Sequence, residues 1–378
     1  MSTARPRIAL AYNSCQYVWY FRRPLIAALR EQGCDVVVVA PRDEYTPRLA
    51  SLGVTYREIR LNAKGTNPVQ ELGTAFSFLH AYRSLRPQVA LHYTIKPNVY
   101  GSLSARLLRI PVIANVTGLG AVFERSGLLN SAVRLLYRAA FAKAAKVFFQ
   151  NADDREAFVT GRLVAPDRAG LLPGSGVDLS WYAPRPRADG PFTFLFVGRL
   201  LQAKGVEDLV SAARAVQTRY PAVRVVLLGE RRDGQPGAAD PGLLDGAAAD
   251  GIITLAGVAE DVRPHIEAAD CVVLPSYYRE GVPRSLLEAA AMGKPLIAAD
   301  SIGTREPVKE GTNGFLCRPR DPKDLAARMC DMVALSPSER RRMGEASRRI
   351  AEQRFDERIV LTAYRELVAR LLTKKGRQ

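Results

Sequence analysis

Short β-branched runs alternate with longer amphipathic stretches along almost the whole chain, and this alternation constrains the fold more than any other feature. The strand-like runs are residues 7–12, 34–40, 88–92, 111–115 and 146–150, then 192–197, 223–228, 252–255, 271–274 and 295–298. The helical patterns between them include residues 22–31, 98–108, 129–142, 206–218, 284–292 and 325–335. Strands that alternate with helices of this length indicate βαβ units and a parallel sheet. Residues 36–39 and 225–228 are apolar throughout, which is typical of strands covered on both faces.

The chain is long enough for two such sheets, because 378 residues exceed what one hydrophobic core usually organises. Residues 182–191 contain three prolines and a glycine, so they can continue neither a helix nor a central strand. We therefore expect two doubly wound α/β domains, at 1–183 and 184–355, and a basic C-terminal helix at 356–378 that packs back on the first. Ligands of such sheets bind outside the carboxyl ends of the strands, which we expect to face a cleft between the domains.

The net charge of +16 is distributed unevenly. Residues 1–185 hold 24 Lys and Arg against 12 Asp and Glu, and residues 81–150 alone hold ten cations against one acid. Such a field attracts polyanions, so nucleic acid, an anionic membrane and a diphosphate-bearing substrate are all candidate partners. A basic surface that serves only solubility stays open as well.

Residues 128–143 give the membrane alternative a specific candidate. Arg134 and Arg138 lie four apart among leucines and aromatic residues, a pattern typical of helices that lie on anionic leaflets. An ordinary core-facing helix with a solvated basic edge fits the same pattern.

Other classes of protein and location are less consistent with the sequence. No apolar run approaches the ~18 residues of a membrane-spanning helix, and the N-terminal residues lack the features of a secretory signal. Five scattered cysteines with apolar neighbours suit a reducing compartment, and three distant histidines form no metal-ligand spacing. We expect a cytoplasmic protein that has no metal and no cofactor.

Residues 275–293 form the segment richest in candidate chemistry. Glu280 and Gly281 lie in a loop after a strand-like run, and Pro283 suits the first turn of a helix, where a missing N–H costs nothing. The first-turn N–H groups would then form an anion site, with the donors at Arg284, Ser285 and Leu286. Glu288, one turn deeper, offers two acceptor oxygens to a ribose diol. A loop acid and a helix acid paired with a nearby arginine would explain the same glutamates without function.

A second constellation follows the strand-like run 192–197. Gly198 and Gly205 bracket two cations, Arg199 and Lys204, of which the arginine can grip phosphate oxygens bidentately and the lysine adds a mobile point charge. Both can equally be solvated surface charges, the usual state of these residues.

Together the two segments resemble the retaining glycosyltransferases of family four, which have the two-domain GT-B fold. The spacing Glu280-x7-Glu288 and the pair Gly198-Arg199 with Lys204-Gly205 are the main points of resemblance. Further matches lie at residues 149–154 and 173–178, at Gly257 with Asp261, at Gly303 with Arg305 and Glu306, and at residues 313–315. The resemblance extends over nearly the whole chain and is densest over residues 173–330.

The resemblance implies a role for each matching position. Arg199 and Lys204 would hold the donor diphosphate, Glu280 the transferred sugar and Glu288 the ribose, while the region of Gly257 would line the base. The implied catalytic residues are Glu280, Arg199 and Lys204, and the implied donor-binding residues are Gly198, Arg199, Lys204, Gly257, Glu280, Gly281, Val282, Pro283, Arg284, Ser285 and Glu288.

The same resemblance implies a metal-independent reaction that retains the anomeric configuration. Two cations and a helix N-terminus directed at the departing diphosphate stabilise its growing charge without a bound ion. No D-x-D pair is present to carry a divalent metal. The departing phosphate would take the acceptor proton, so Glu280 is better suited to electrostatic support than to nucleophilic attack.

The first domain departs from the family pattern at two loops. Residues 13–22 lack the usual glycines, and residues 115–120 lack the histidine that many members place beside the reacting sugar. The segments 20–22, 94–98 and 117–120 instead resemble the subgroup that acts on undecaprenyl-diphosphate-linked sugars. The acceptor-binding candidates are Asn13, Lys96, Asn98, Thr117 and Gly118.

The sequence thus predicts a glycosyltransferase that is peripheral on the inner face of the membrane. It would transfer a hexose or N-acetylhexosamine to an undecaprenyl-diphosphate-linked sugar in glycan assembly. The preferred candidate for the transferred sugar is N-acetylgalactosamine, with UDP as its carrier. One alternative is a GT-B enzyme with a soluble acceptor. Another is a basic nucleic-acid-binding protein, although no helix-turn-helix, zinc-finger spacing or aromatic stacking platform supports it.

Overall fold

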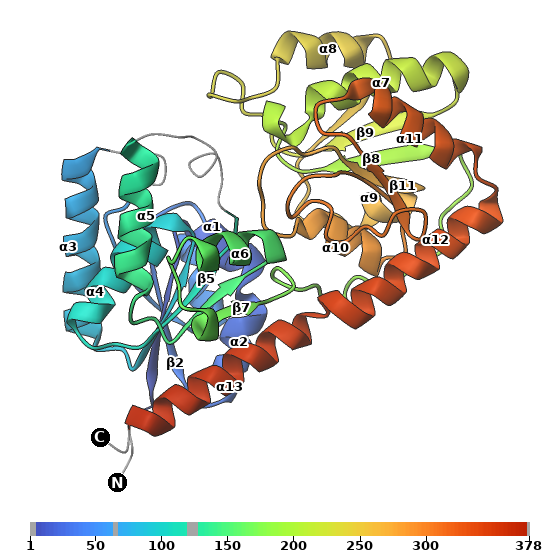
Figure 1. The fold of residues 1–378 in the computed structure, drawn as a ribbon. Helices are drawn as coiled ribbons and strands as arrows, with labels where there is room; N and C mark the ends of the chain where they lie inside the picture. The colour runs from blue at the N-terminus through green and yellow to red at the C-terminus, as the bar shows by residue number, and fades with distance from the viewer. Residues whose placement is uncertain (1–4, 63–66, 119–127, 376–378) are drawn as a thin grey trace. The chain divides into compact units, whose positions relative to one another are not determined.

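The computed structural model describes residues 5–62, 67–118 and 128–375. The chain divides into two compact units, which we call unit 1 (Met1–Ser175 with Arg358–Gln378) and unit 2 (Gly176–Glu357). Each unit contains one parallel sheet flanked by helices (Figure 1). The predicted α/β class with two doubly wound sheets is therefore confirmed. Residues 182–191, which we expect to connect the domains, lie inside unit 2.

Unit 1 is built on seven parallel strands in the order β3-β2-β1-β4-β5-β6-β7. Their bounds are β1 (Arg7–Ala11), β2 (Asp35–Ala40), β3 (Thr55–Glu58), β4 (Val89–Tyr93), β5 (Val112–Val116), β6 (Lys146–Phe149) and β7 (Ala169–Leu171). The order reverses between β1 and β4, which are paired in register from Ile8 opposite Val89. Such a switch point is where open parallel sheets bind ligands.

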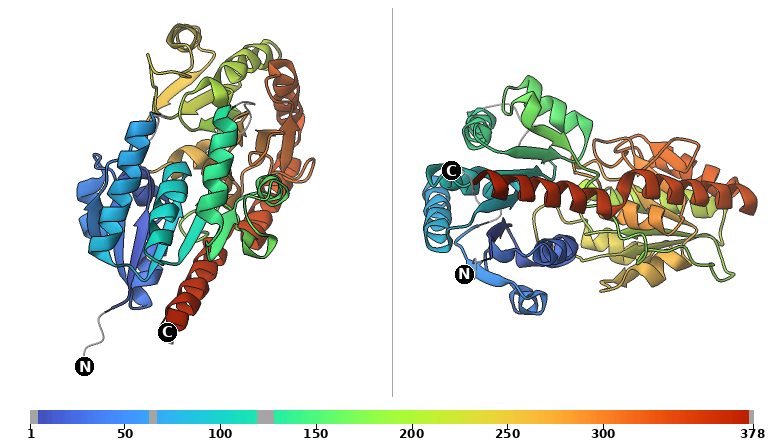
Figure 2. Two further views of the ribbon diagram at one scale, coloured as in Figure 1. Left: turned by 60° about the vertical axis from the view of Figure 1, so that its left-hand side comes forward. Right: turned by 90° about the horizontal axis from the view of Figure 1, so that it is seen from below.

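Helices cover both faces of this sheet because successive residues of a strand point to opposite faces. Ile8 and Leu10 of β1 are buried in a core that also contains side chains of α1 (Cys15–Phe21), α2 (Arg23–Glu31) and α13 (Glu357–Lys375). Ala9 and Ala11 are buried in a second core on the other face. That core includes side chains of α3 (Pro68–Leu85), α4 (Ser102–Leu107), α5 (Leu128–Phe141) and α6 (Ala152–Thr160) (Figure 2). Short helical turns, η1 (Thr46–Leu52), η2 (Pro97–Gly101) and η4 (Pro166–Arg168), complete the unit.

Unit 2 repeats the plan with six parallel strands in the order β10-β9-β8-β11-β12-β13. The strands are β8 (Thr193–Val197), β9 (Arg224–Leu228), β10 (Thr254–Gly257), β11 (Cys271–Leu274), β12 (Leu296–Ala299) and β13 (Gly314–Cys317). The helices are α7 (Val206–Arg219), α8 (Pro241–Ala249), α9 (Arg263–Ala268), α10 (Arg284–Ala291), α11 (Pro322–Ala334) and α12 (Pro337–Ile350), with the turns η5 (Gln202–Lys204) and η6 (Ala351–Phe355).

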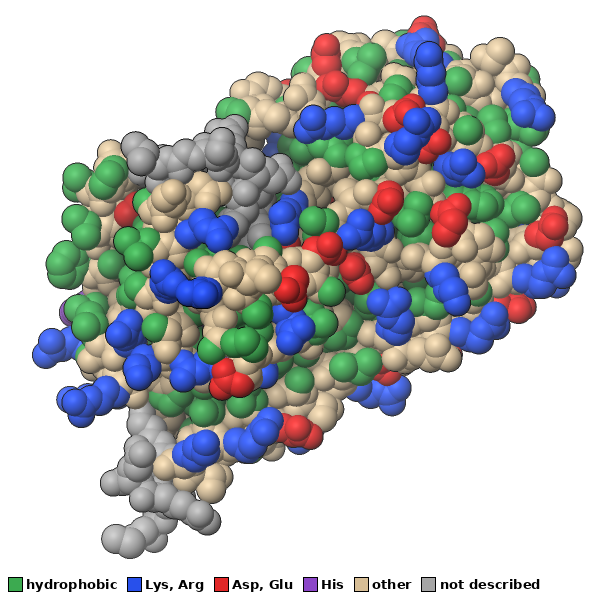
Figure 3. All heavy atoms as spheres, in the orientation of Figure 1, with side chains coloured by type: hydrophobic (Ala, Val, Ile, Leu, Met, Phe, Trp, Pro, Cys, Tyr) green, Lys and Arg blue, Asp and Glu red, His purple; other side chains and the backbone are tan. Residues whose placement is uncertain are grey.

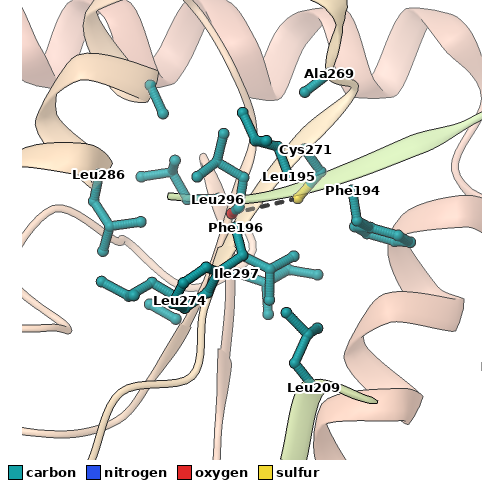
Figure 4. Close-up of a cluster of buried hydrophobic side chains, with 14 of the residues drawn as sticks. Phe194, Leu195, Phe196, Leu209, Ala269, Cys271, Leu274, Leu286, Leu296 and Ile297 are labelled. Carbon is teal, nitrogen blue, oxygen red and sulfur yellow. Dashed lines mark hydrogen bonds between the residues drawn. The ribbon is translucent and has the colours of Figure 1, made fainter. Parts of the chain in front are cut away.

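The core of unit 2 fixes the two central strands, and with them the loops that follow those strands. Phe194 and Phe196 of β8, Leu274 of β11 and Leu286 of α10 are fully buried in one cluster (Figure 4). The switch point of this sheet lies between β8 and β11. Within the described ranges, no helix is both long and apolar enough to cross a membrane.

Candidate functional site

The donor-site candidates follow the carboxyl ends of β8 and β11, the two strands at the switch point of unit 2. β8 ends at Val197 and leads directly into Gly198 and Arg199. β11 ends at Leu274 and leads into the loop that carries Glu280. Since the two strands are neighbours and parallel, the sheet places these loops at the same edge.

Lys204 and Glu280 form an ion pair at this edge. The Lys204 Nζ lies 2.6 Å from both Glu280 carboxylate oxygens, and the Ser276 hydroxyl donates to Oε1 at 2.6 Å. The two charged side chains are only 13% and 16% exposed, so water screens their attraction little. The structure thus brings together two of the three predicted catalytic residues, and adds Ser276, which sequence reasoning missed.

Backbone contacts hold the Lys204 loop against the end of β11. Gly205 has a φ of +71°, and a Cβ there would lie 2.2 Å from the Pro275 carbonyl oxygen. The backbone N–H groups of Tyr277 and Tyr278 both donate to the Ala203 carbonyl at 3.1 Å. Only glycine permits this approach, so the register between the two loops depends on position 205.

Arg199 is the exposed member of the predicted cation pair. Among the described residues, its guanidinium has no ion-pair or hydrogen-bond partner. Lys204 is neutralised by Glu280, whereas Arg199 keeps its charge available at the same edge of the sheet.

A row of glycines continues this edge toward β10. The Gly229 N–H donates to the Gly257 carbonyl at 2.7 Å, and a Cβ at Gly229 would lie 1.7 Å from the Gly198 carbonyl oxygen. Gly257 itself is exposed, with a φ of +69°. The predicted residues Gly198 and Gly257 are therefore linked through Gly229, a position that the sequence motifs did not indicate.

The start of α10 differs from the prediction in two details. Pro283 is the N-cap, with φ −65° and ψ 122°, and the first helical residue is Arg284. The Leu286 N–H donates to the Pro283 carbonyl at 3.2 Å, so the prediction that it is free for an anion is wrong. The tight first turn after the proline is the physical reason. Gly281, Val282 and Pro283 are buried, and Arg284 and Ser285 are half-buried.

Glu288 is buried and bonded to protein. Its Oε1 accepts from the Tyr182 hydroxyl at 2.8 Å and from Arg284 Nε at 2.7 Å. Burial alone would lower the pKa of Arg284, but the Glu288 carboxylate and Tyr182 outweigh it and raise that pKa. Burial, followed by the charge of Glu288, raises the pKa of Tyr182. The helix acid is thus paired with a nearby arginine, as the alternative reading allows, and Tyr182 from residues 182–191 is a partner that the sequence did not indicate.

The acceptor-site candidates lie at the carboxyl ends of β1, β4 and β5 in unit 1. Asn13 follows β1, Lys96 and Asn98 follow β4, and Thr117 and Gly118 follow β5. Leu119 and Gly120, which complete the last motif, lie outside the described residues.

Two of these candidates have protein partners. Lys96 forms an ion pair with Glu71 of α3, in which both side chains are largely buried. Asn98 is almost fully buried, and its Nδ2 donates to the Asn115 carbonyl at 2.8 Å. Thr94, just before them, has a φ of +66°, which is unusual for a β-branched residue and marks local backbone strain.

No group of three or more His, Cys, Asp or Glu side chains suited to a metal ion occurs in the part of the chain that the structure describes. The polar groups at the two sheet edges are arginine, lysine, carboxylates, amides and backbone donors, which are groups able to bind phosphates and sugar hydroxyls.

Two doubly wound α/β units are the architecture of the GT-B transferases. Protein-family models agree: the model for glycosyl transferases group 1 matches residues 191–334, and the glycosyl transferase 4-like domain matches residues 18–174. The chain therefore belongs to the family-four glycosyltransferases.

The names of similar proteins agree with this family assignment. The chain is similar to the N,N'-diacetylbacillosaminyl-diphospho-undecaprenol alpha-1,3-N-acetylgalactosaminyltransferase of Campylobacter jejuni, at 26% identity over 97% of this chain and 99% of the relative. It is also 31% identical to the glycogen synthase of Mycobacterium tuberculosis, over 53% of this chain and 48% of that protein.

Solved structures share the fold across both units. A glycosyltransferase from Rickettsia africae matches with a TM-score of 0.79 at 16% identity, covering 98% of this chain and 99% of its own. HepE from Anabaena, solved with UDP and glucose, matches with a TM-score of 0.79 at 19% identity, covering 96% and 99%.

Proposed function

We propose that this glycosyltransferase moves N-acetylgalactosamine, or a related N-acetylhexosamine or hexose, from a UDP-sugar to an undecaprenyl-diphosphate-linked sugar. The observation that carries the donor half is the Lys204–Glu280 ion pair at the β8–β11 switch point, together with the exposed Arg199 at the same edge, which has no ion-pair partner among the described residues. The activity for which the Campylobacter relative is named supports the acceptor half, because the similarity extends over both units. The UDP complex of the Anabaena protein supports the choice of nucleotide.

In this proposal the donor diphosphate lies at the carboxyl edge of unit 2. Arg199 binds its oxygens, Lys204 adds a second cation, and the N–H groups of Arg284 and Ser285 at the start of α10 complete the cradle. The leaving diphosphate gains negative charge as the glycosidic bond breaks, so fixed cations stabilise the transition state more than the ground state. These protein groups would serve the reaction without a divalent metal.

The role we propose for Glu280 follows from its partners. A carboxylate that holds Lys204 and accepts from Ser276 is positioned to orient the lysine and the transferred sugar. It is poorly suited to attack the anomeric carbon, because that would require it to leave the ion pair. We therefore propose retention in which the acceptor hydroxyl approaches from the side of the leaving phosphate, which takes the proton.

We also propose that unit 1 contacts an anionic membrane through the outer face of α3, α4 and α5. Val69, Leu72 and Phe76 are spaced three and four residues apart on α3 and are strongly exposed, as are Leu107 and Leu135 on the neighbouring helices. Figure 3 shows hydrophobic side chains at the α3 side of unit 1, with Lys and Arg side chains and few acids beside them. Exposed apolar groups with adjacent cations are the chemistry that binds anionic leaflets.

Unit 1 also has a surface hollow of about 690 Å³ that is lined with basic side chains. Lys143, Arg168, Arg370 and Lys374 line it together with one acid, Asp167. None of these cations takes part in an ion pair between described residues.

A radiolabelled transfer assay tests the function. The protein is incubated with labelled UDP-N-acetylgalactosamine and either a polyprenyl-diphosphate-linked sugar or the corresponding free glycan. We expect label in the organic phase with the lipid-linked acceptor only. Label that enters only water-soluble product contradicts the lipid acceptor.

A matched pair of variants ties the reaction to the donor edge. We expect R199A to abolish the rise in melting temperature that UDP causes in the wild type. Arg224 is likewise exposed but begins β9, at the opposite edge of the same sheet, so R224A is expected to keep the effect. If R199A and R224A respond alike, the diphosphate does not bind at this edge.

A further inference from the structure

An arginine is buried in unit 1 without a carboxylate partner. Arg22 lies between α1 and α2 and is 2% exposed, and no ion pair joins it to a carboxylate among the described residues. Its Nε has no hydrogen-bond partner. A buried charge without a counter-charge is costly, so its retention calls for an explanation beyond packing.

Three tyrosines surround this guanidinium. It lies 4.0 Å from the centroid of the Tyr93 ring and 5.9 Å from that of Tyr12, and those two rings stack at 5.2 Å. Burial lowers the pKa of Arg22, but Tyr93, Tyr12 and Tyr364 outweigh it, so the group stays charged. Aromatic faces hold a cation but carry no net charge. The positive field of Arg22 is therefore not cancelled by its surroundings.

The cluster lies at the carboxyl edge of the sheet, at the switch point of unit 1. Tyr12 follows β1, and Tyr93 is the last residue of β4. Asn115 of the neighbouring strand β5 donates from Nδ2 to the Tyr364 hydroxyl at 3.1 Å, which joins α13 to the same cluster. Arg22 is thus placed beneath the loops that carry the acceptor-site candidates.

Two of those candidates present unsatisfied acceptors at the same edge. The side-chain oxygens of Asn13 and Asn98 are buried and have no hydrogen-bond donor within the described structure. Two acids have defined bonds near these candidates, and neither bonds to Arg22. Asp43 accepts from the Ser14 hydroxyl and from the Gln16 N–H, and Glu71 pairs with Lys96. The edge therefore combines an uncancelled positive charge with acceptors suited to hydroxyl or amide donors.

We propose that Arg22 is a specificity-determining residue that draws the diphosphate of the acceptor to this edge through its electrostatic field. This inference rests on the proposed function for the identity of the acceptor. At 2% exposure the guanidinium acts from beneath the surface, without direct contact. The low dielectric around it preserves the field, which solvent would otherwise weaken. The substrate class is a sugar that carries a diphosphate.

Binding of two matched amphiphiles tests the proposal. One is farnesyl-diphosphate-linked N-acetylglucosamine, and the other is the neutral farnesyl N-acetylglucosaminide; both are titrated by calorimetry with UDP present to occupy the donor site. We expect the wild type to prefer the diphosphate by about tenfold or more. R22M should lose that preference, and R22K, which keeps the charge, should retain most of it.

Arg23 provides the matched control. It is the adjacent residue, exposed, with its guanidinium 4.8 Å from the Trp19 ring. R23M removes the same charge at the surface and is expected to keep the preference. If R22M and wild type show the same ratio of affinities, or if R23M loses the preference as R22M does, the inference is wrong.

A measurement on the wild type tests the role of Arg22 even if R22M does not fold. A buried charge is screened less than exposed ones, so the preference for the diphosphate should persist at about 0.5 M salt. A preference that disappears there belongs to surface cations and overturns the role of Arg22. Because sugar transfer is not the readout, a protein that shows the Arg22-dependent preference but transfers no sugar contradicts the proposed function alone.

Discussion

Single residues decide the charge balance at the carboxyl edge of the sheet in unit 2, where we propose that the donor binds. Lys204 neutralises Glu280, so Arg199, which has no ion-pair partner among the described residues, supplies the local excess of positive charge. The sequence predicted these three positions because each lies in the loop after a strand, in a recognisable motif. It could not identify Tyr182, Ser276 or Gly229, because their roles depend on contacts between segments distant in the chain.

Removing one partner of the Lys204–Glu280 pair should affect catalysis strongly. We expect K204M to lower kcat by about 10²–10³, the usual cost of losing one group that stabilises transition-state charge. E280Q removes the carboxylate charge but keeps an acceptor for Lys204, and should cost less. The measurement is steady-state kinetics with UDP-sugar and lipid-linked acceptor. Equal kcat values for K204M and wild type would contradict the assignment.

His92 should make the stability of unit 1 sensitive to acid. It is fully buried between the Tyr82 hydroxyl, 2.7 Å from Nε2, and the Ser102 hydroxyl, 2.9 Å from Nδ1. Burial lowers its pKa to about 3. Below about pH 6.5, His92 binds a proton in the unfolded chain but not in the folded chain. The free energy of unfolding therefore decreases by up to about 1.4 kcal/mol for each unit by which the pH is lowered from 6.5 to 3.

Denaturant unfolding at several pH values checks this prediction. The stability gap between wild type and H92Q should narrow as pH falls through that window, because only the wild type loses this contribution. H80Q, at an exposed histidine on α3, should track the wild type throughout. A gap between wild type and H92Q that does not change with pH would show that His92 does not titrate as expected.

At the scale of elements, the central strands and the edge strand β10 were predictable, whereas the other three edge strands were not. The ten predicted runs correspond to strands of the structure, because central parallel strands are apolar and covered on both faces. The strands β3, β7 and β13, which the sequence did not indicate, each lie at the end of a sheet. Edge strands are short and partly solvated, so they lack the continuous apolar run that marks the others.

Helix α3 was missed for a related reason. It buries Phe78, Ala81 and Tyr82 against the sheet but exposes Val69, Leu72 and Phe76. Apolar residues on both faces obscure the helical period on which sequence reading depends. The same feature makes α3 part of the surface proposed to contact the membrane.

The stability of unit 2 should depend strongly on Gly205, which joins η5 to α7. G205A adds a Cβ that would lie 2.2 Å from the Pro275 carbonyl oxygen, in a left-handed backbone conformation. Gly251 has a similar φ of +72° but open space around it, so G251A isolates the cost of the conformation, about 1–2 kcal/mol. We expect G205A to lower the free energy of unfolding by clearly more than G251A. Equal losses in denaturant unfolding would mean that the loops adjust freely.

At the scale of the whole molecule, the uneven charge and the exposed apolar residues of unit 1 predict binding to anionic vesicles. L72S with F76S should weaken flotation with vesicles rich in acidic phospholipid, without loss of stability, because these side chains are 61% and 67% exposed. L171S, at an exposed leucine on the edge strand β7, is the control and should float as the wild type does. Unchanged flotation of the double variant would exclude this face as the contact.

The ends of unit 2 lie side by side within that unit. Val177 and Asp356 form a parallel bridge, and the Glu357 N–H donates to the Val177 carbonyl at 3.1 Å. Topologically, unit 2 is thus an insertion in unit 1, whose own chain resumes at Arg358. Inserts with adjoining termini can be exchanged between hosts without stretching the backbone. If unit 2 binds the donor and unit 1 the acceptor, as proposed, replacement of unit 2 as a block changes the donor and leaves the acceptor site intact.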